Sequence, residues 1–249
     1  MLTDMLAKRG FDVTVIEKEK QAGGQINLAD KPPHKGKLHW CAEDLLTNAE
    51  KAGAKIIYGV TVTKDIIAAY SPEYVINATG GNAVQPKAFE GENVVTVTEI
   101  LNGNIKVENK KVCVIGSGMT GLETSELLCE AGNQVSIVEM ADEIAPGAWF
   151  QHLDDALPKL KRYNTRFYTS SKLTEIKSDG IIIENTKTKK AEHLSCDLVV
   201  LSLGVRPDNA LYEEIKNLFK HVYNIGDSSK VGRIYNATES AYQVVKSIK

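Results

Sequence analysis

The sequence has few cysteines, and their spacing fits no common metal site, disulfide framework or redox centre. The four cysteines, Cys41, Cys113, Cys129 and Cys196, are far apart and form no CxxC pair. Zinc sites and redox dithiols require ligands or thiols at short, fixed spacing, so this pattern excludes a zinc site, a disulfide framework and a dithiol centre. Cys113 and Cys129 lie in apolar surroundings, and we predict that they are small buried hydrophobic residues.

Long apolar runs and an excess of positive charge are also missing. The formal net charge is −2 and Lys and Arg are scattered, which excludes a basic surface for nucleic acid. No apolar run approaches the roughly 20 residues of a membrane-spanning helix, and the N-terminus lacks the pattern of a signal peptide. We therefore expect a cytoplasmic protein without nucleic-acid or membrane partners. The sequence contains no heptad pattern from which an oligomeric state could be predicted.

The remaining composition is that of a globular protein. Hydrophobic residues make up 43% of the chain and charged residues 25%. A length of 249 residues is enough for one large domain or two ordinary ones, each with its own core.

The most informative stretch is a glycine-rich turn near the middle of the chain. An apolar run over Lys111–Ile115 ends in Gly116, Gly118 and Gly121 and continues into a segment with helical periodicity. At this spacing the first glycine allows a tight turn, the second lets a pyrophosphate approach, and the third lets the helix lie close to the sheet. The helix N-terminus would offer free N–H groups to the phosphates. The intervening turn residues, Ser117, Met119 and Thr120, are predicted to share this dinucleotide site.

An acidic residue follows at the end of the next predicted strand. Glu139 lies about twenty residues beyond the turn, where a carboxylate that binds the ribose is expected. A carboxylate accepts hydrogen bonds from a free 2′-hydroxyl and repels a 2′-phosphate, and Met140 and Ala141 supply no cation. The sequence therefore favours NAD(H) over NADP(H), unless Lys or Arg from elsewhere reaches the site. A glycine turn that holds no nucleotide is the alternative interpretation.

The same helix–strand pattern occurs twice at a constant offset. The N-terminal segment is predicted to be a helix that stops at Gly10, followed by a strand that ends in Glu17. These match the helix end at Gly132 and the strand end at Glu139 in the central unit. Projected backward, the first glycine turn falls just before Met1. We therefore expect the first half to begin inside its nucleotide-binding helix; a coincidental match of simple patterns is the alternative.

The rest of the chain alternates helices and strands, as in an α/β fold. Gly23 and Gly24 lie in a Gly- and Pro-rich loop over 21–36 and permit close approach to a ligand. Asp227 follows a short strand and is placed to bind a ligand hydroxyl or to form an Asx turn. The other predicted elements are a helix over 38–52, strands over 54–62 and 74–77, a strand over 133–139, a β-meander over 166–194, strands over 197–203 and 220–225, and a helix from 236 onward.

In their order along the chain, these motifs resemble flavoprotein reductases with two dinucleotide-binding domains. More narrowly, Gly23-Gly24-Gln25 and Pro32-Pro33-x-Lys35 resemble the C-terminal reductase portion of the 2,4-dienoyl-CoA reductase and NADH:flavin oxidoreductase (old yellow enzyme-like) family. The resemblance covers essentially the whole chain. The ordered motifs are Glu17, Ala78-Thr79-Gly80-Gly81, Gly116-x-Gly118-x-x-Gly121, Gly204-Val-Arg206-Pro207 and Ile225-Gly226-Asp227.

The resemblance implies an α/β fold of two Rossmann-like domains, of the pyridine nucleotide-disulfide reductase type, with the second inserted in the first. Residues 1–104 and 204–249 would form an FAD-binding-type domain whose first strand and glycine loop are missing, and residues 105–203 an NAD(P)H-binding domain. The NAD(P)H site would comprise the central glycine turn and Glu139. The FAD-type site would comprise Glu17, Gly24, Gln25, Ala78, Thr79, Gly80, Gly81, Gly204, Arg206, Gly226 and Asp227.

The implied function is electron input to a longer enzyme. Hydride would pass from NAD(P)H to FAD and on to a barrel with FMN and an iron-sulfur cluster that is absent here, in a parent enoate or 2,4-dienoyl-CoA reductase. FAD is expected in that parent, and FMN and the cluster only in the missing portion. Cofactors carry such chemistry, so we predict no catalytic side chain and no metal ligand. The alternatives are a nucleotide-binding fragment without its own activity and a stand-alone FAD-dependent NAD(P)H reductase.

Overall fold

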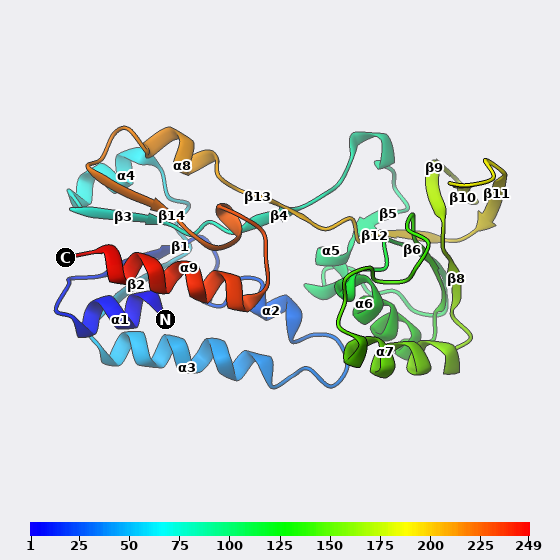
Figure 1. The fold of residues 1–249 in the computed structure, drawn as a ribbon, viewed down its shortest axis with the longest axis horizontal. Helices are drawn as coiled ribbons and strands as arrows, with labels where there is room; N and C mark the ends of the chain where they lie inside the picture. The colour runs from blue at the N-terminus through cyan, green and yellow to red at the C-terminus, as the bar shows by residue number, and fades with distance from the viewer. The chain divides into compact units, whose positions relative to one another are not determined.

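A computed structural model describes residues 1–249, and in it the chain folds into two compact units. Unit 1 contains Met1–Asn27, Lys37–Asn82 and Val205–Lys249, and unit 2 contains Leu28–Gly36 and Ala83–Gly204. The larger segment of unit 2 is therefore inserted between segments of unit 1, as predicted (Figure 1). The boundaries placed at 104 and 203 concern the cofactor domains and stay a prediction.

Unit 2 is built on a parallel sheet of five strands in the order β5-β12-β6-β7-β8. Alternate residues of β6 point to opposite faces, because side chains alternate along a strand. Val112 and Val114 pack with three helices on one face, and Cys113 and Ile115 join the core beside an antiparallel sheet of β9, β10 and β11. The elements are β5 (Val94–Thr96), α5 (Val97–Leu101), β6 (Lys111–Ile115), α6 (Met119–Glu130), β7 (Gln134–Val138), α7 (Phe150–Arg162), β8 (Arg166–Tyr168), β9 (Ser171–Lys177), β10 (Gly180–Asn185), β11 (Ala191–Ser195) and β12 (Leu198–Leu201).

Unit 1 contains two separate parallel pairs, β1 with β2 and β14 with β3. Helices α1 and α9 share one core with side chains of β3 and β14 and with Val13, which directly precedes β1. Leu6 of α1 and Val245 of α9 are among its buried residues. The elements of unit 1 are α1 (Leu2–Lys8), β1 (Thr14–Glu17), α3 (Leu38–Lys51), β2 (Lys55–Tyr58), α4 (Lys64–Tyr70), β3 (Tyr74–Asn77), α8 (Ala210–Ile215), β14 (His221–Asn224), η2 (Gly226–Ser228) and α9 (Ile234–Ser247). Helix α2 (Ile26–Ala29) lies at the boundary with unit 2, and the short helix η1 (Lys87–Phe89) belongs to unit 2. A further two-stranded sheet joins β4 (Gly81–Ala83) and β13 (Val205–Pro207).

The two copies of the predicted repeat share their local geometry. Helices α1 and α6 are each followed by a glycine with positive φ, +90° at Gly10 and +80° at Gly132. In both copies the residue after this glycine donates its N–H to a carbonyl of the last helical turn. Strand β7 has two neighbours, β6 and β8, whereas β1 pairs only with β2.

Several elements differ from the sequence-based expectation, and the helices α4, α5 and α8 and the short strands β4 and β13 were not predicted. The meander predicted over 166–194 is divided, since β8 joins the parallel sheet and only β9–β11 are antiparallel. The loop over 21–36 contains the one-turn helix α2, and the strand β5 and the helix α7 were not predicted. Helix α7 contains Pro158, a residue that normally ends a helix, which obscured its pattern. No helix of the fold combines the length and apolar character needed to cross a bilayer.

Candidate nucleotide-binding sites

The glycine turn of unit 2 lies between β6 and α6 and ends in an uncapped helix N-terminus. Gly118 is the N-cap of α6, it provides no side-chain cap, and the first helical turn contains no acidic residue. The first N–H groups of a helix lack partners within the helix, and here no side chain of the cap supplies an acceptor. Such an N-terminus attracts an anion through its N–H groups and the helix dipole. The turn therefore presents an uncapped helix N-terminus to an anion, and its role as a pyrophosphate cradle stays a prediction.

The three glycines of the turn are needed for different reasons. Gly116 has φ +100°, and a Cβ at this position would lie 3.0 Å from the carbonyl carbon of Ser202 and closer still to its oxygen. A Cβ at Gly121 would overlap the carbonyl oxygen of Gly116 and lie 2.9 Å from Oγ of Ser202. At Gly118 a Cβ would meet nothing within 4 Å, and φ is −53°. Protein packing thus accounts for two glycines, and only the backbone at Gly118 is open to a ligand.

Glu139 is held at the end of β7 by the glycine turn. Its Oε2 accepts hydrogen bonds from the Ser117 N–H at 2.9 Å and the Ser117 hydroxyl at 2.7 Å, and its Oε1 accepts from the Ala141 N–H at 2.8 Å. Burial alone would raise the pKa of Glu139, but the hydrogen bonds from Ala141, Ser117 and Met140 lower it below its usual value. The structure therefore places an ionised carboxylate directly beside the predicted cradle.

In unit 1, two predicted residues from distant parts of the chain lie together. Gln25 Nε2 is 3.4 Å from Asp227 Oδ2, and Oδ1 of Asp227 accepts a hydrogen bond from the Gly232 N–H. Glu17, at the end of β1, accepts the Glu19 N–H through Oε1, the bond that Ala141 makes to Glu139 in the other copy. The amide and carboxylate groups are of the kind that binds ribose or ribityl hydroxyls. The cofactor roles of these residues stay predictions.

The Ala78–Gly81 and Gly204–Arg206 turns contact one another rather than standing free. The Thr79 hydroxyl donates to the Asp208 carbonyl at 2.6 Å. A Cβ at Gly81 would lie 2.6 Å from Val205 Cγ1 and 2.7 Å from the Arg206 oxygen, so packing of β13 on β4 explains this glycine. Ala78 and Gly80 belong to the same turn. Gly80 and Gly204 have positive φ, and a Cβ added at either would meet no atom within 4 Å. Arg206 is exposed. Gly226 has φ +62° and donates its N–H to Ser240 Oγ.

Several polar residues of unit 1 that the sequence did not single out link the ends of β3 and β14. Asn77, which is buried, donates to Asn224 Oδ1 at 2.9 Å and to Thr79 Oγ1 at 3.1 Å. The buried Ser228 hydroxyl donates to the same Asn224 oxygen at 2.7 Å. An asparagine at the end of each of two neighbouring strands was the available signal. This network fixes the turn that carries Asp227.

Three of the four cysteines are buried, and Cys41 is exposed. Cys113, Cys129 and Cys196 are buried free thiols, which confirms the packing role predicted for the first two. Contact with Cys196 and burial raise the pKa of the Cys113 thiol, so it stays protonated. A thiolate nucleophile is therefore not available at this position.

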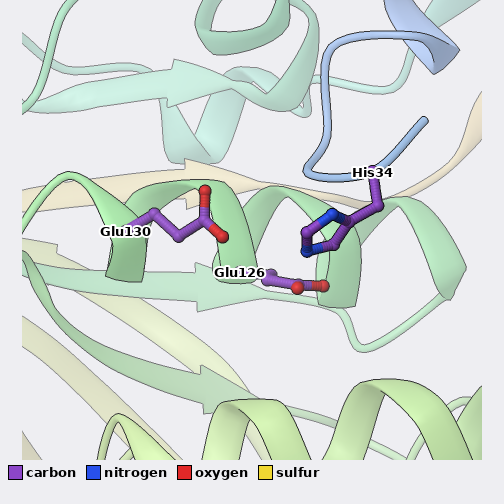
Figure 2. A group of neighbouring side chains, drawn as sticks. All are labelled: His34, Glu126 and Glu130. Atoms are coloured by element: carbon purple, nitrogen blue, oxygen red, sulfur yellow. The ribbon is translucent and has the colours of Figure 1, made fainter. Parts of the chain in front are cut away.

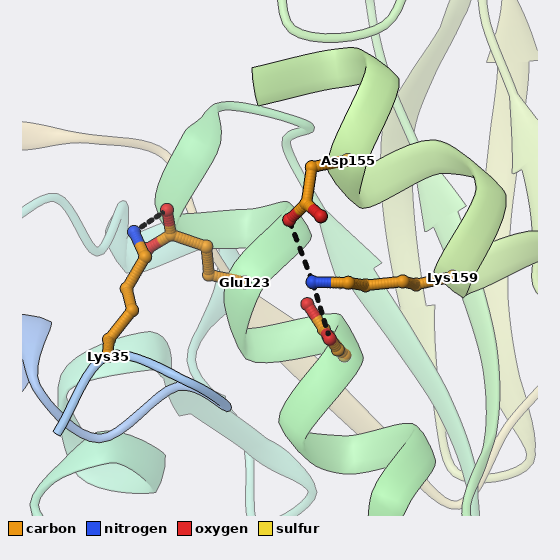
Figure 3. A network of polar contacts seen from close by, with 5 residues as sticks. Lys35, Glu123, Asp155 and Lys159 are labelled. Atoms are coloured by element: carbon orange, nitrogen blue, oxygen red, sulfur yellow. Dashed lines mark hydrogen bonds and ion pairs between the residues drawn. The ribbon is translucent and has the colours of Figure 1, made fainter. Parts of the chain in front are cut away.

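Charged side chains form ion pairs along α6 beyond the glycine turn. Lys159 of α7 lies 2.7 Å from Asp155 and 3.5 Å from the buried Glu126, and Lys35 forms an ion pair with Glu123 (Figure 3). The hydrogen bond to Asp155 and the charge of Glu126 raise the pKa of Lys159. These pairs attach the 28–36 segment and α7 to α6 within unit 2.

One group near these pairs has the chemistry of metal ligands. His34, Glu126 and Glu130 place their ligand atoms within 4.8 Å of one another, with both glutamates on α6 (Figure 2). The Glu126 carboxylate is already paired with Lys159. Proximity is the only feature that marks this group, so we assign it no ligand.

Comparison with known proteins places the chain among flavoproteins. The sequence pattern of the pyridine nucleotide-disulphide oxidoreductase family matches residues 3–241. NADH oxidase of Thermoanaerobacter brockii is 35% identical over 248 residues, 97% of this chain and 38% of that protein. Bilirubin reductase of Mediterraneibacter gnavus is 32% identical over 238 residues, 94% of this chain and 36% of that protein. The structure of 2-naphthoyl-CoA reductase in complex with 2-naphthoyl-CoA has a TM-score of 0.92 at 28% identity, covering 100% of this chain and 38% of that one.

The fold and the glycine turn define a dinucleotide-binding α/β protein of the oxidoreductase class. The chain belongs to the pyridine nucleotide-disulphide oxidoreductase family, whose members use FAD and NAD(P)H. It corresponds to the C-terminal FAD/NAD-binding portion of the 2,4-dienoyl-CoA reductase and NADH:flavin oxidoreductase family, which confirms the resemblance inferred from the motifs. The chain spans 38% and 36% of the lengths of the two relatives named above.

Proposed function

We propose that this chain is the electron-input module of an NADH-dependent flavoprotein oxidoreductase. The observation that carries the proposal is the glycine turn of unit 2, where the backbone at Gly118 is open, the α6 N-terminus is uncapped and the Glu139 carboxylate lies beside both. When bound, the nicotinamide supplies a hydride and the flavin accepts it. The protein's own contribution in this proposal is binding and orientation, so we expect no catalytic side chain.

The carboxylate of Glu139 supports NADH as the preferred nucleotide. The hydrogen bonds that lower its pKa keep it ionised at neutral pH, so it can accept hydrogen bonds from the ribose 2′- and 3′-hydroxyls and repel a 2′-phosphate. The groups that contact this carboxylate are backbone N–H groups and a serine hydroxyl, none of which is cationic. Nothing among these contacts would neutralise the additional charge of NADPH.

Flavin binding belongs to unit 1 in this proposal. Glu17 and the Gln25–Asp227 pair supply acceptors and a donor for hydroxyl groups of FAD. Among residues 1–249 no glycine turn of the central type precedes β1. We expect the isolated chain to bind FAD weakly and the longer parent to bind it firmly.

The reducible substrate belongs to the parent enzyme in this proposal. The relatives include a bilirubin reductase, a cinnamate reductase and a 2-naphthoyl-CoA reductase by name. We propose that the parent reduces an enoate or a 2,4-dienoyl-CoA, with electrons passing from this module to a separate barrel that carries FMN and an iron-sulfur cluster. The alternatives are a nucleotide-binding fragment without its own activity and a stand-alone FAD-dependent NAD(P)H reductase.

Absorbance and nucleotide titration of the purified chain test the proposal. We expect saturable quenching of intrinsic fluorescence by NADH, with weaker quenching by NADPH, and little flavin absorbance unless FAD is added in excess. Tightly retained FAD with NADH-dependent bleaching would favour the stand-alone reductase. Failure to bind either nicotinamide nucleotide would contradict the proposal for this chain.

Replacement of Glu139 by alanine is expected to weaken NADH binding about tenfold, which corresponds to the loss of charge-assisted hydrogen bonds worth roughly 1.4 kcal/mol. NADPH binding should be unchanged or tighter, because the repulsion of the 2′-phosphate is removed. Fluorescence titration with both nucleotides measures the two dissociation constants. Glu143→Ala, which removes an exposed carboxylate of the same loop, serves as the control. Equal preference for the two nucleotides before and after the Glu139 change would remove its role in selectivity.

A further inference from the structure

Ser117 connects three segments of unit 2 through its side chain and backbone. It is fully buried in the glycine turn, between Gly116 and Gly118. Its N–H donates to Glu139 Oε2 at 2.9 Å, its hydroxyl lies 2.7 Å from the same oxygen, and the Ala145 N–H lies 2.8 Å from the hydroxyl oxygen. Ala145, itself buried, has φ +47° in the segment that follows β7.

The direction of these hydrogen bonds is fixed by chemistry. A backbone N–H can only donate, so the Ser117 hydroxyl oxygen accepts from Ala145 and its proton is directed to the Glu139 carboxylate. The carboxylate thus receives two hydrogen bonds on Oε2 from one residue and one on Oε1 from Ala141. Glu139 is only partly buried, so a ligand can approach the carboxylate from the solvent side.

The strand-end glutamate has one local contact that recurs in both copies of the repeat. Its Oε1 accepts the N–H of the residue two positions later, at 2.9 Å in Glu17 and 2.8 Å in Glu139. The other oxygen of Glu139, Oε2, is held by Ser117 from a different segment of unit 2. Both carboxylate oxygens of Glu139 are therefore fixed by hydrogen bonds.

We propose that Ser117 is a positioning residue for nucleotide recognition, which holds the Glu139 carboxylate toward the ribose hydroxyls of NADH and ties the Ala145 segment to the same turn. This inference rests on the proposed NADH site. The hydroxyl acts through Glu139 and through the Ala145 N–H, and its removal leaves a buried N–H without an acceptor and a carboxylate with one donor fewer. Loss of a hydrogen bond to a charged group is the larger of the two effects on ligand binding.

The ionisation of Glu139 gives a readout that a purely structural role would not change. The groups that act on its carboxyl are the N–H groups of Ser117, Met140 and Ala141 and the Ser117 hydroxyl, all of them uncharged. Burial opposes them, since it disfavours the charged form. Removal of the hydroxyl therefore moves the pKa of Glu139 upward, and the acid limit of NADH binding moves with it.

Ser117→Ala tests the inference with two independent measurements. NMR titration of the Glu139 carboxyl in the nucleotide-free protein should show a higher pKa than in the unsubstituted protein. Fluorescence titration should show NADH binding about tenfold weaker at neutral pH with less discrimination against NADPH. The control is Ser125→Ala, which also removes a fully buried serine hydroxyl, in this case one within α6 that donates to the Gly121 carbonyl at 2.7 Å. It should leave the pKa of Glu139 unchanged.

A double variant separates positioning from general loosening. If Ser117 acts through Glu139, the effects of Ser117→Ala and Glu139→Ala on NADH affinity are not additive, and the first has little effect in the presence of the second. Full additivity, or NADH binding by Ser117→Ala with an unchanged dissociation constant and an unchanged Glu139 pKa, would overturn the inference alone. Absence of NADH binding in the unsubstituted protein would overturn the proposed function instead.

Discussion

Gly118→Val is expected to abolish NADH binding while the protein stays folded. The valine side chain would occupy the open space above the turn, where the proposed pyrophosphate lies against the backbone. No protein atom lies within 4 Å of a Cβ at this position, and φ of −53° with ψ of 166° is an ordinary conformation for an L residue. We expect at least about a 100-fold rise in the NADH dissociation constant, or roughly 2.7 kcal/mol, measured by fluorescence titration.

A matched control for this change exists in the same chain. At Gly36 a Cβ would also meet nothing within 4 Å and φ is not in the left-handed region, so Gly36→Val adds the same side chain outside the proposed site. It should keep the NADH affinity of the unsubstituted protein. An unchanged dissociation constant in Gly118→Val would count against the pyrophosphate site, and unfolding of that variant, seen by circular dichroism, would contradict the open geometry at Gly118.

Gly121→Ala is expected to destabilise the protein by roughly 2 to 3 kcal/mol or more, although alanine is normally the better residue within a helix. The gain in helix propensity is at most about 1 kcal/mol. Against it stands an overlap with the backbone oxygen of Gly116, which cannot move aside as a flexible side chain can, and a 2.9 Å contact with Ser202 Oγ. Overpacking outweighs propensity, and the midpoint of urea unfolding should fall.

Gly118→Ala is the control for this prediction, because it adds the same methyl group three residues earlier where nothing lies within 4 Å. We expect its unfolding midpoint to stay close to that of the unsubstituted protein. If Gly121→Ala unfolded at the same or a higher urea concentration than Gly118→Ala, the result would contradict the close packing of α6 against the Gly116 carbonyl.

The sequence alone determined the features that depend on local residue patterns. The apolar run of β6, the glycines of the turn and the periodicity of α6 are contiguous, so their spacing predicts a strand, a tight turn and a helix. The repeat was readable for the same reason, since each copy places a glycine and a glutamate at fixed distances from a helix end. Ordered motifs along the chain also predicted the family, which the comparisons confirmed.

Elements without a local signature could not be predicted. Strand β5 is short and becomes a strand because β12 offers it a hydrogen-bonding edge, and a sheet edge is invisible in the sequence. Helix α7 contains Pro158, which disfavours a helix interior. Burial of Ala156 and Leu160 against the sheet stabilises the helix and outweighs the unfavourable effect of the proline. In both cases contacts with distant residues decide the local conformation.

The sequence by itself determined that this protein has a dinucleotide turn, a strand-end glutamate and the order of motifs of a flavoprotein reductase. Only the tertiary structure decided which glycines packing requires, since contacts with Ser202 and Val205 explain Gly116 and Gly81, while among the three glycines of the central turn only Gly118 is open. It also decided that Ser117 holds Glu139. The physical reason is that close backbone approach and hydrogen-bond direction arise between segments far apart in the chain, and residue spacing carries no information about them.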